Sequence, residues 1–228
     1  MEKNGTIKGI IFDADGTLLD SMGAWDIAPK QYVENQGKVP VDDLTEILFP
    51  LTPYDTAKAV RDLHHIDKEV EEVYAGITEI MKNFYETEVE AKPGVIELLR
   101  RSKDAGIKMV IATNTDRECI EAALKRLGIT EYFTGILTCA EVGHSKAEPD
   151  IFFKAMELIG TKPEESLLVE DGLFALETGE KIGMVLAGVY DEVSKANREK
   201  MKEITHCYIE KEESLTKLIE VFKLCSGD

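Results

Sequence analysis

Two aspartates stand two positions apart at the end of an apolar run near the start of the chain. Residues 10–12 (IIF) are followed by Asp13 and Asp15, and then by a Gly-Thr pair. Such a run is typical of a strand that is buried on both faces. Placing carboxylates at its end costs desolvation energy, so their presence there indicates that something binds. A hard cation together with a phosphate group is the natural candidate.

Two later apolar runs also end in polar residues. One run precedes Thr113 and Asn114, and the other precedes Glu170 and Asp171. In a doubly wound parallel sheet, ligands bind beyond the carboxyl ends of the strands, which lie along one edge. The three polar strand ends are therefore expected to converge there, although each of them alone could be a turn or a helix cap.

Four carboxylates on one edge of a sheet repel one another unless a cation lies between them. Mg²⁺ binds a few carboxylates together with water and substrate phosphate. A carboxylate can also act as a nucleophile and form an aspartyl-phosphate. A metal ion would neutralise both the attacking carboxylate and the phosphoryl oxygens, and a hydroxyl and a lysine would complete the cradle for the transferring group.

Strand and helix patterns alternate from residue 92 onward, with glycines at the ends of several helices. The expected strands after residues 10–12 are residues 108–112, 135–139, 166–169, 184–190 and 207–209, and the expected helices include residues 117–127, 149–159 and 213–224. Such alternation implies right-handed βαβ units. The predicted fold class is α/β, with a Rossmann-like doubly wound parallel sheet as the core.

Residues 21–91 show helical spacing of apolar residues and no strand pattern. The expected helices are residues 22–37, 41–49, 52–65 and 68–89, the third capped by Thr52 ahead of a proline. His64 and His65 are expected to be exposed helix residues. We predict an inserted α-helical cap domain at residues 21–91 and a discontinuous catalytic core made of residues 1–20 and 92–228.

The composition limits the class of protein and the choice of partners. The chain has 228 residues, 43% of them hydrophobic, and a formal net charge of −17, which suits one domain with an insert. So acidic a surface repels nucleic acid and anionic membranes. The four cysteines include no CxxC pair, and the N-terminal apolar run is too short for a signal peptide, so we expect a cytoplasmic protein with reduced thiols. A monomer or weak homodimer is compatible with the sequence, which does not determine the oligomeric state.

Four motifs, in order and spacing, resemble those of the haloacid dehalogenase superfamily of phosphatases. They are DADGT at residues 13–17, ATN at residues 112–114, Lys146 ahead of PDIF at residues 149–152, and ED at residues 170–171. The helical block lies between the first and second motifs. This position resembles the subgroup with a helical cap that includes β-phosphoglucomutase and phosphoglycolate phosphatase.

The resemblance implies a role for each motif residue. Asp13 would attack phosphorus and bind Mg²⁺. Asp15 would protonate the leaving oxygen, then activate water, and would bind the metal through its backbone carbonyl. Thr113 and Lys146 would bind the phosphoryl group, and Asn114 would contact the substrate.

Glu170 and Asp171 would complete the metal site, directly or through water.

Trp25 departs from the pattern of the β-phosphoglucomutases, which place a histidine at about this position, and residues 48–59 lack the arginine with which those mutases hold a second phosphate. The resemblance therefore implies a Mg²⁺-dependent phosphatase acting on a small phosphorylated metabolite. A sugar phosphomutase and a non-enzymatic binding protein that retains the site are the alternatives.

Overall fold

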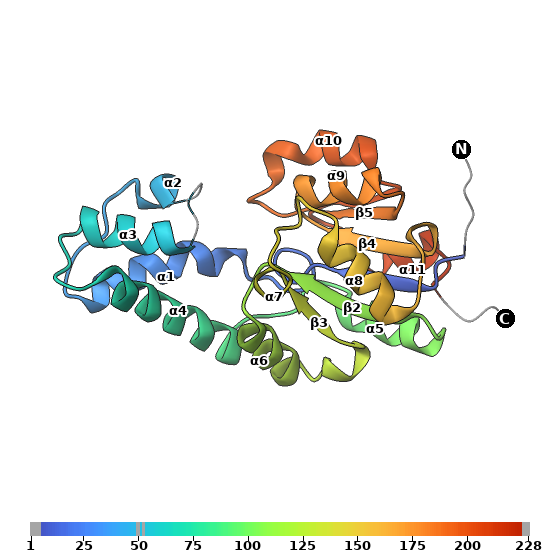
Figure 1. Ribbon diagram of the computed structural model, residues 1–228, viewed down its shortest axis with the longest axis horizontal. Coiled ribbons are helices and arrows are strands. Elements are labelled where there is room, and N and C mark those ends of the chain that lie inside the picture. The colour runs from blue at the N-terminus through green and yellow to red at the C-terminus, as the bar shows by residue number, and fades with distance from the viewer. Residues whose placement is uncertain (1–5, 49–50, 52, 225–228) are drawn as a thin grey trace. The chain divides into compact units, whose positions relative to one another are not determined.

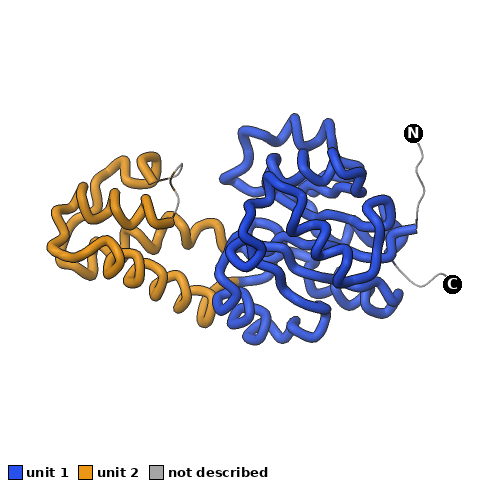
Figure 2. Tube along the Cα trace, viewed as in Figure 1, with its two compact units in different colours: residues 1–20, 90–228 blue, residues 21–89 orange. Residues whose placement is uncertain are grey.

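Residues 6–48, 51 and 53–224 are described here from a computed structural model of the chain (Figure 1). The chain forms two compact units, residues 1–20 with 90–228, and residues 21–89 (Figure 2). No helix in the described part of the chain combines the length and the low polarity that crossing a bilayer requires. Cys225, one of the four cysteines of the chain, lies outside the described residues.

Six parallel strands form the sheet of the larger unit, in the order β3-β2-β1-β4-β5-β6. They are β1 (Gly9–Phe12), β2 (Lys108–Thr113), β3 (Ile136–Thr138), β4 (Ser166–Glu170), β5 (Val185–Val189) and β6 (Cys207–Ile209). The chain runs outward from β1 to β3 and then returns to the other side of β1 with β4. The carboxyl ends of β1 and β4 therefore flank the switch point of the sheet. The predicted doubly wound α/β class is confirmed.

Helices cover both faces of this sheet (Figure 1). α8, α9 and α10 pack against Ile11 of β1 and its neighbours in one apolar cluster. Ile10 and Phe12 point to the opposite face and are equally buried. Burial on both faces explains the continuous apolar strands. The helices of this unit are α5 (Val95–Asp104), α6 (Arg117–Leu127), α7 (Cys139–Val142), α8 (Asp150–Ile159), α9 (Leu173–Lys181), α10 (Arg198–Ile204) and α11 (Lys217–Val221), with 3₁₀ turns at Thr130–Tyr132, Pro163–Glu165 and Lys195–Asn197.

Some elements differ from those expected. The strand expected at residues 135–139 ends earlier because Thr138 caps α7, its hydroxyl accepting a hydrogen bond from the backbone N–H of Glu141 at 3.2 Å. The helix expected at residues 213–224 is shorter and covers Lys217–Val221. α7 and α10 are additional helices of four and seven residues. Helices this short do not complete enough turns for an apolar periodicity to be recognised.

The smaller unit consists of α1 (Met22–Asn35), α2 (Leu44–Leu48), α3 (Pro53–Leu63) and α4 (Val70–Thr87). It has its own core, to which Tyr32, Val60 and Val73 contribute. A β-carbon on Gly76 of α4 would lie 2.2 Å from the ring of Tyr32. Glycine is therefore what allows α1 and α4 to pack this closely. Thr52, the expected cap, lies outside the described residues.

His64 is buried, and the expectation that it would be exposed is wrong. Its Nε2 accepts a hydrogen bond from the backbone N–H of Val41 at 3.2 Å, so Nδ1 carries the proton and donates it to the carbonyl of Val60 at 2.9 Å. The imidazole thereby joins α3 to the segment that leads into α2. His65 is exposed, as expected, but lies just after α3.

Candidate active site

The carboxyl ends of β1 and β4 bring three acidic side chains together. Asp13 follows β1, Glu170 ends β4, and Asp171 comes next. Each offers a carboxylate oxygen within 4.8 Å of the other two, and all three residues are buried. The strand register causes this meeting, because Phe12 pairs with Val169 and the backbone N–H of Asp13 donates to the Val169 carbonyl at 2.9 Å. We call Asp13, Glu170 and Asp171 the acidic cluster.

Lys146 reaches the acidic cluster from the segment between α7 and α8. Only 1% of it is exposed. Its ammonium group contacts the carboxylate of Asp13 and donates to Oε2 of Glu170 at 2.8 Å. An ammonium group this buried is strongly destabilising unless it is paired and hydrogen-bonded, and the two carboxylates provide both.

Burial and the neighbouring charges shift the pKa values of Asp13, Asp171 and Lys146. Burial and repulsion from Glu170 raise the pKa of Asp13 to about 8, although Lys146 opposes the shift. Burial and repulsion from Glu170 and Asp13 also raise the pKa of Asp171 well above its usual value. Burial would lower the pKa of Lys146, but attraction to Asp13 and Glu170 outweighs it and the pKa is raised. A cation bound beside the two aspartates would oppose the upward shift of their pKa values.

The acidic cluster fits a hard divalent cation. Its donors are all carboxylate oxygens, which suit Mg²⁺ better than softer metals. Asp13, Glu170 and Asp171 would hold the ion, which would supply charge neutralisation for the nucleophile and the phosphoryl group. Among the described residues, the side chain of Asp15 is not part of this group, which leaves its backbone carbonyl as the contribution implied by the resemblance.

A tight turn after β1 supports the acidic cluster. The backbone N–H of Gly16 donates to the carbonyl of Leu19 at 2.9 Å, and that of Leu19 donates to the carbonyl of Ala14 at 2.8 Å. Gly16 has a φ of +81°, and a β-carbon there would lie 2.5 Å from Oδ2 of Asp171. Thr17 donates its hydroxyl to Oδ1 of Asp171 at 3.3 Å. The Gly-Thr pair of the first motif therefore makes room for Asp171 and orients it.

Thr113 and Asp15 are linked through a residue that the sequence analysis missed, Thr115. Thr113 ends β2 and is buried, and its hydroxyl oxygen accepts a hydrogen bond from the backbone N–H of Thr115 at 3.0 Å. The hydroxyl of Thr115 donates to Oδ2 of Asp15 at 2.6 Å. Asn114, between the two threonines, is exposed. The available signal for Thr115 is a hydroxyl residue just after a strand end, which commonly forms local turn hydrogen bonds.

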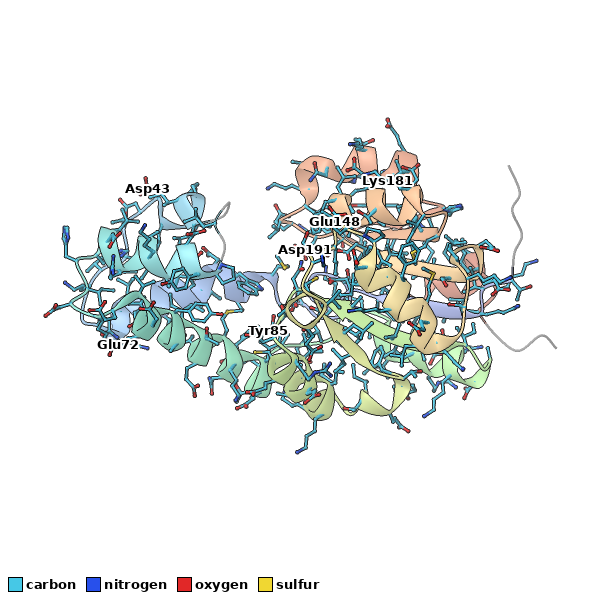
Figure 3. All side chains as sticks on the ribbon, in the orientation of Figure 1. Asp43, Glu72, Tyr85, Glu148, Lys181 and Asp191 are labelled. Atoms are coloured by element: carbon cyan, nitrogen blue, oxygen red, sulfur yellow. The ribbon has the colours of Figure 1, made fainter. Side chains whose placement is uncertain are left out.

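A buried ion pair next to the acidic cluster was also missed. The ammonium group of Lys92 donates to Oδ2 of Asp191 and to the carbonyl of Tyr190, both at 2.9 Å. Asp191, labelled in Figure 3, lies two residues after β5, and its charge adds to burial in raising the pKa of Asp171. The backbone N–H of Lys92 donates to the carbonyl of Leu18 at 2.9 Å. Lys92 thus connects the turn after β1 to the end of β5.

All of the predicted site residues lie in the larger unit, at the carboxyl ends of its strands or in the segments that follow them. The acidic cluster and Lys146 lie close together. Thr115 links Asp15 to Thr113 through one hydrogen bond to each. Asn114 is exposed just after the end of β2.

Comparison with known proteins agrees with this arrangement. The family model of the haloacid dehalogenase-like hydrolases matches residues 10–189, which include every predicted site residue. The chain belongs to the haloacid dehalogenase-like hydrolase family. Membership of this hydrolase family, predicted from the four motifs, is therefore confirmed.

Several relatives of this hydrolase carry the names of phosphatases. Pyrophosphatase PpaX of Bacillus cereus is 29% identical over 187 residues, which are 80% of this chain and 83% of the relative. The phosphorylated carbohydrates phosphatase of Thermotoga maritima is 26% identical over 179 residues, 78% of this chain and 82% of the relative. The crystal structure of a candidate β-phosphoglucomutase of Thermotoga maritima has the same fold, with a TM-score of 0.81 at 24% identity over 94% of this chain and 100% of that one.

Proposed function

We propose that this hydrolase is a Mg²⁺-dependent phosphatase that cleaves a small phosphomonoester metabolite through an aspartyl-phosphate on Asp13. The observation that carries the proposal is the contact between Asp13 and the ammonium group of Lys146 inside the acidic cluster. Lys146 favours the ionised form of Asp13, which is the form that attacks phosphorus. The same ammonium group attracts the phosphoryl group toward the nucleophile.

The proposed reaction has two balanced steps. In the first, an oxygen of Asp13 attacks phosphorus, the bond to the leaving oxygen breaks, and Asp15 gives its proton to that oxygen. In the second, Asp15 takes a proton from water, the water oxygen attacks phosphorus, and the bond to Asp13 breaks to release phosphate. The hydroxyl oxygen of Thr113 accepts from the backbone N–H of Thr115, and in this proposal its own proton is donated to a phosphoryl oxygen.

The smaller unit, residues 21–89, would act as the cap that excludes water and selects the leaving group. Its separate apolar core and its insertion between β1 and β2 support this role. The names of the relatives, a pyrophosphatase and a phosphatase of phosphorylated carbohydrates, support a phosphorylated metabolite as substrate. We place the reaction in the cytoplasm, where Cys139 and Cys207 would persist as the reduced thiols seen in the structure.

A panel of phosphorylated metabolites tests the proposal. The panel contains sugar phosphates, phosphoglycolate, nucleoside monophosphates, phosphorylated cofactors and pyrophosphate, and phosphate release is measured with Mg²⁺ and with EDTA. We expect Mg²⁺-dependent release from at least one monoester. Asp13→Asn preserves the shape of the side chain and should abolish turnover. Release by that variant at the wild-type rate would exclude Asp13 as nucleophile.

The same panel distinguishes the alternatives by the fate of the phosphoryl group. Interconversion of sugar phosphates without net release of phosphate, primed by a bisphosphate, would indicate a phosphomutase. Binding of Mg²⁺ without release from any compound would indicate a binding protein.

Acid-quenched samples of the wild-type protein should contain phosphate on the chain that hydroxylamine removes, because hydroxylamine cleaves acyl phosphates.

A further inference from the structure

Thr115 makes one hydrogen bond to each of two groups in the candidate active site. Its hydroxyl donates to Oδ2 of Asp15 at 2.6 Å, and its backbone N–H donates to the hydroxyl oxygen of Thr113 at 3.0 Å. Thr115 is only 6% exposed; its bond to Thr113 is buried, and its bond to Asp15 is partly buried. A distance of 2.6 Å lies at the short end of the usual range for an O–H···O hydrogen bond.

We propose that Thr115 is a positioning residue that holds the carboxyl group of Asp15 for proton transfer. The inference rests on the proposed function, in which Asp15 protonates the leaving oxygen. A carboxyl group has two oxygens, and the terminal torsion of an aspartate is soft. With Oδ2 accepting from Thr115, the proton that is transferred sits on Oδ1, and the rotation of the carboxyl plane is restricted.

The hydrogen bond from Thr115 also matters energetically at the moment of transfer. As Asp15 loses its proton, negative charge develops on the carboxyl group. A donor that is already in place interacts more strongly with the charged form than with the neutral one. The interaction therefore strengthens toward the transition state, which is the condition for an effect on rate. The size of this effect on the rate depends on how basic the leaving oxygen is, because a more basic oxygen departs only when it is protonated.

Substitutions can separate this role of Thr115 from its neighbours' roles. Thr115→Val removes the hydroxyl but keeps the backbone N–H that orients Thr113. Thr115→Ser restores the hydroxyl. Thr161→Val is the matched control, because the Thr161 hydroxyl bonds to Ser166 at 2.7 Å, at the amino end of β4 and away from the carboxyl edge of the sheet.

The experiment compares kcat/KM for two aryl phosphates in the presence of Mg²⁺. Phenyl phosphate has a leaving oxygen that needs a proton, whereas 2,4-dinitrophenyl phosphate has one that leaves without it. The ratio kcat/KM reports only the steps up to the departure of that oxygen. General acid catalysis contributes about 10²–10⁴-fold. We expect Thr115→Val to lower kcat/KM about 10- to 100-fold for phenyl phosphate and less than about threefold for 2,4-dinitrophenyl phosphate. We expect Thr115→Ser to recover most of the loss, and Thr161→Val to change neither ratio.

Each other outcome rejects the inference. Equal losses with both esters would mean that Thr115→Val distorts the site generally, and no loss with either would mean that the hydroxyl has no role. Asp15→Asn tells a failure of the inference from a failure of the proposed function. A selective loss with phenyl phosphate in Asp15→Asn but not in Thr115→Val rejects the role of Thr115 alone. No selective loss in Asp15→Asn, or no turnover by the wild-type protein of either ester or of any compound in the metabolite panel, rejects both.

Discussion

Gly16 and Asp171 approach each other so closely that a single methyl group on Gly16 would lie 2.5 Å from Oδ2 of Asp171. The two residues are far apart in sequence and belong to the first and last motifs of the site. The glycine also has a φ of +81°, which disfavours any other residue. Gly16 is therefore constrained both by the backbone of the turn and by the carboxylate beside it.

We expect Gly16→Ala to displace Asp171 and to lower the affinity for Mg²⁺ about 10- to 100-fold, the usual effect of disturbing groups that orient metal ligands. The measurement is a Mg²⁺ titration of phosphate release. The matched control is Gly183→Ala, because Gly183 has a φ of +82° and no atom within 4 Å of an added β-carbon. Both variants should lose about 1–2 kcal/mol of stability from backbone strain. An equal shift of the Mg²⁺ titration in both would contradict the steric explanation.

The raised pKa of Asp13 predicts a pH-dependent stability in metal-free protein. Asp13 keeps its proton up to about pH 8 in the folded state, against a usual pKa of 3.8. Between these values the folded state binds more protons than the unfolded state, so the contribution of Asp13 to the free energy of unfolding falls as pH rises. Asp13→Asn removes this proton and should gain stability relative to the wild-type protein from pH 4 to pH 8.

Thermal unfolding of both proteins in EDTA across this pH range measures the difference. Mg²⁺ should reduce the trend, because it favours the ionised carboxylate. A difference between the two proteins that stays constant from pH 4 to pH 8 would show that Asp13 is not the group responsible.

The buried pair of Lys92 and Asp191 predicts a strong coupling in unfolding experiments. The exposed fractions of the two side chains are 11% and 7%. Lys92→Met leaves a buried carboxylate without its partner and should cost about 3–5 kcal/mol. The double variant with Asp191→Leu removes both charges and should cost less than the sum of the single variants.

Urea unfolding of the four proteins of this cycle gives the coupling energy. Lys195→Met is the control, because Lys195 pairs with Glu192 at 2.6 Å on the surface, where both side chains are at least 60% exposed. That variant should unfold like the wild-type protein. Additive effects of Lys92→Met and Asp191→Leu would show that the two side chains do not act as a pair.

Much of the fold could be predicted because the larger unit follows simple rules. The strands are buried on both faces, so they are visible as apolar runs, and the glycines between them end the helices. The acidic cluster could be predicted from the same pattern, because parallel strands end at one edge of the sheet. Asp13 and Glu170 meet there through the register of β1 and β4.

What could not be predicted depends on contacts between distant residues. Lys146 alone looks like a surface lysine, and it was predicted as a site residue only through the resemblance to the family, whereas its contacts with Asp13 and Glu170 come from the structure. The bonds from Thr115 to Asp15 and from Lys92 to Asp191 span about 100 positions and have no local pattern. His64 was misjudged for the same reason, because a backbone amide from another segment satisfies its ring. Helical spacing shows which face is apolar but not which polar side chain finds a buried partner.

The strand order also sets a sequence of events during synthesis of the chain. β1 emerges among the first residues, but its neighbour β4 exists only once residue 170 has been made. Until then one side of the central strand has no partner, and neither Glu170 nor Asp171 is available. The smaller unit has its own core and is complete at residue 89, so it can fold before the remaining strands of the larger unit have been synthesised. A nascent chain can thus present a folded helical insert well before it acquires any capacity for chemistry.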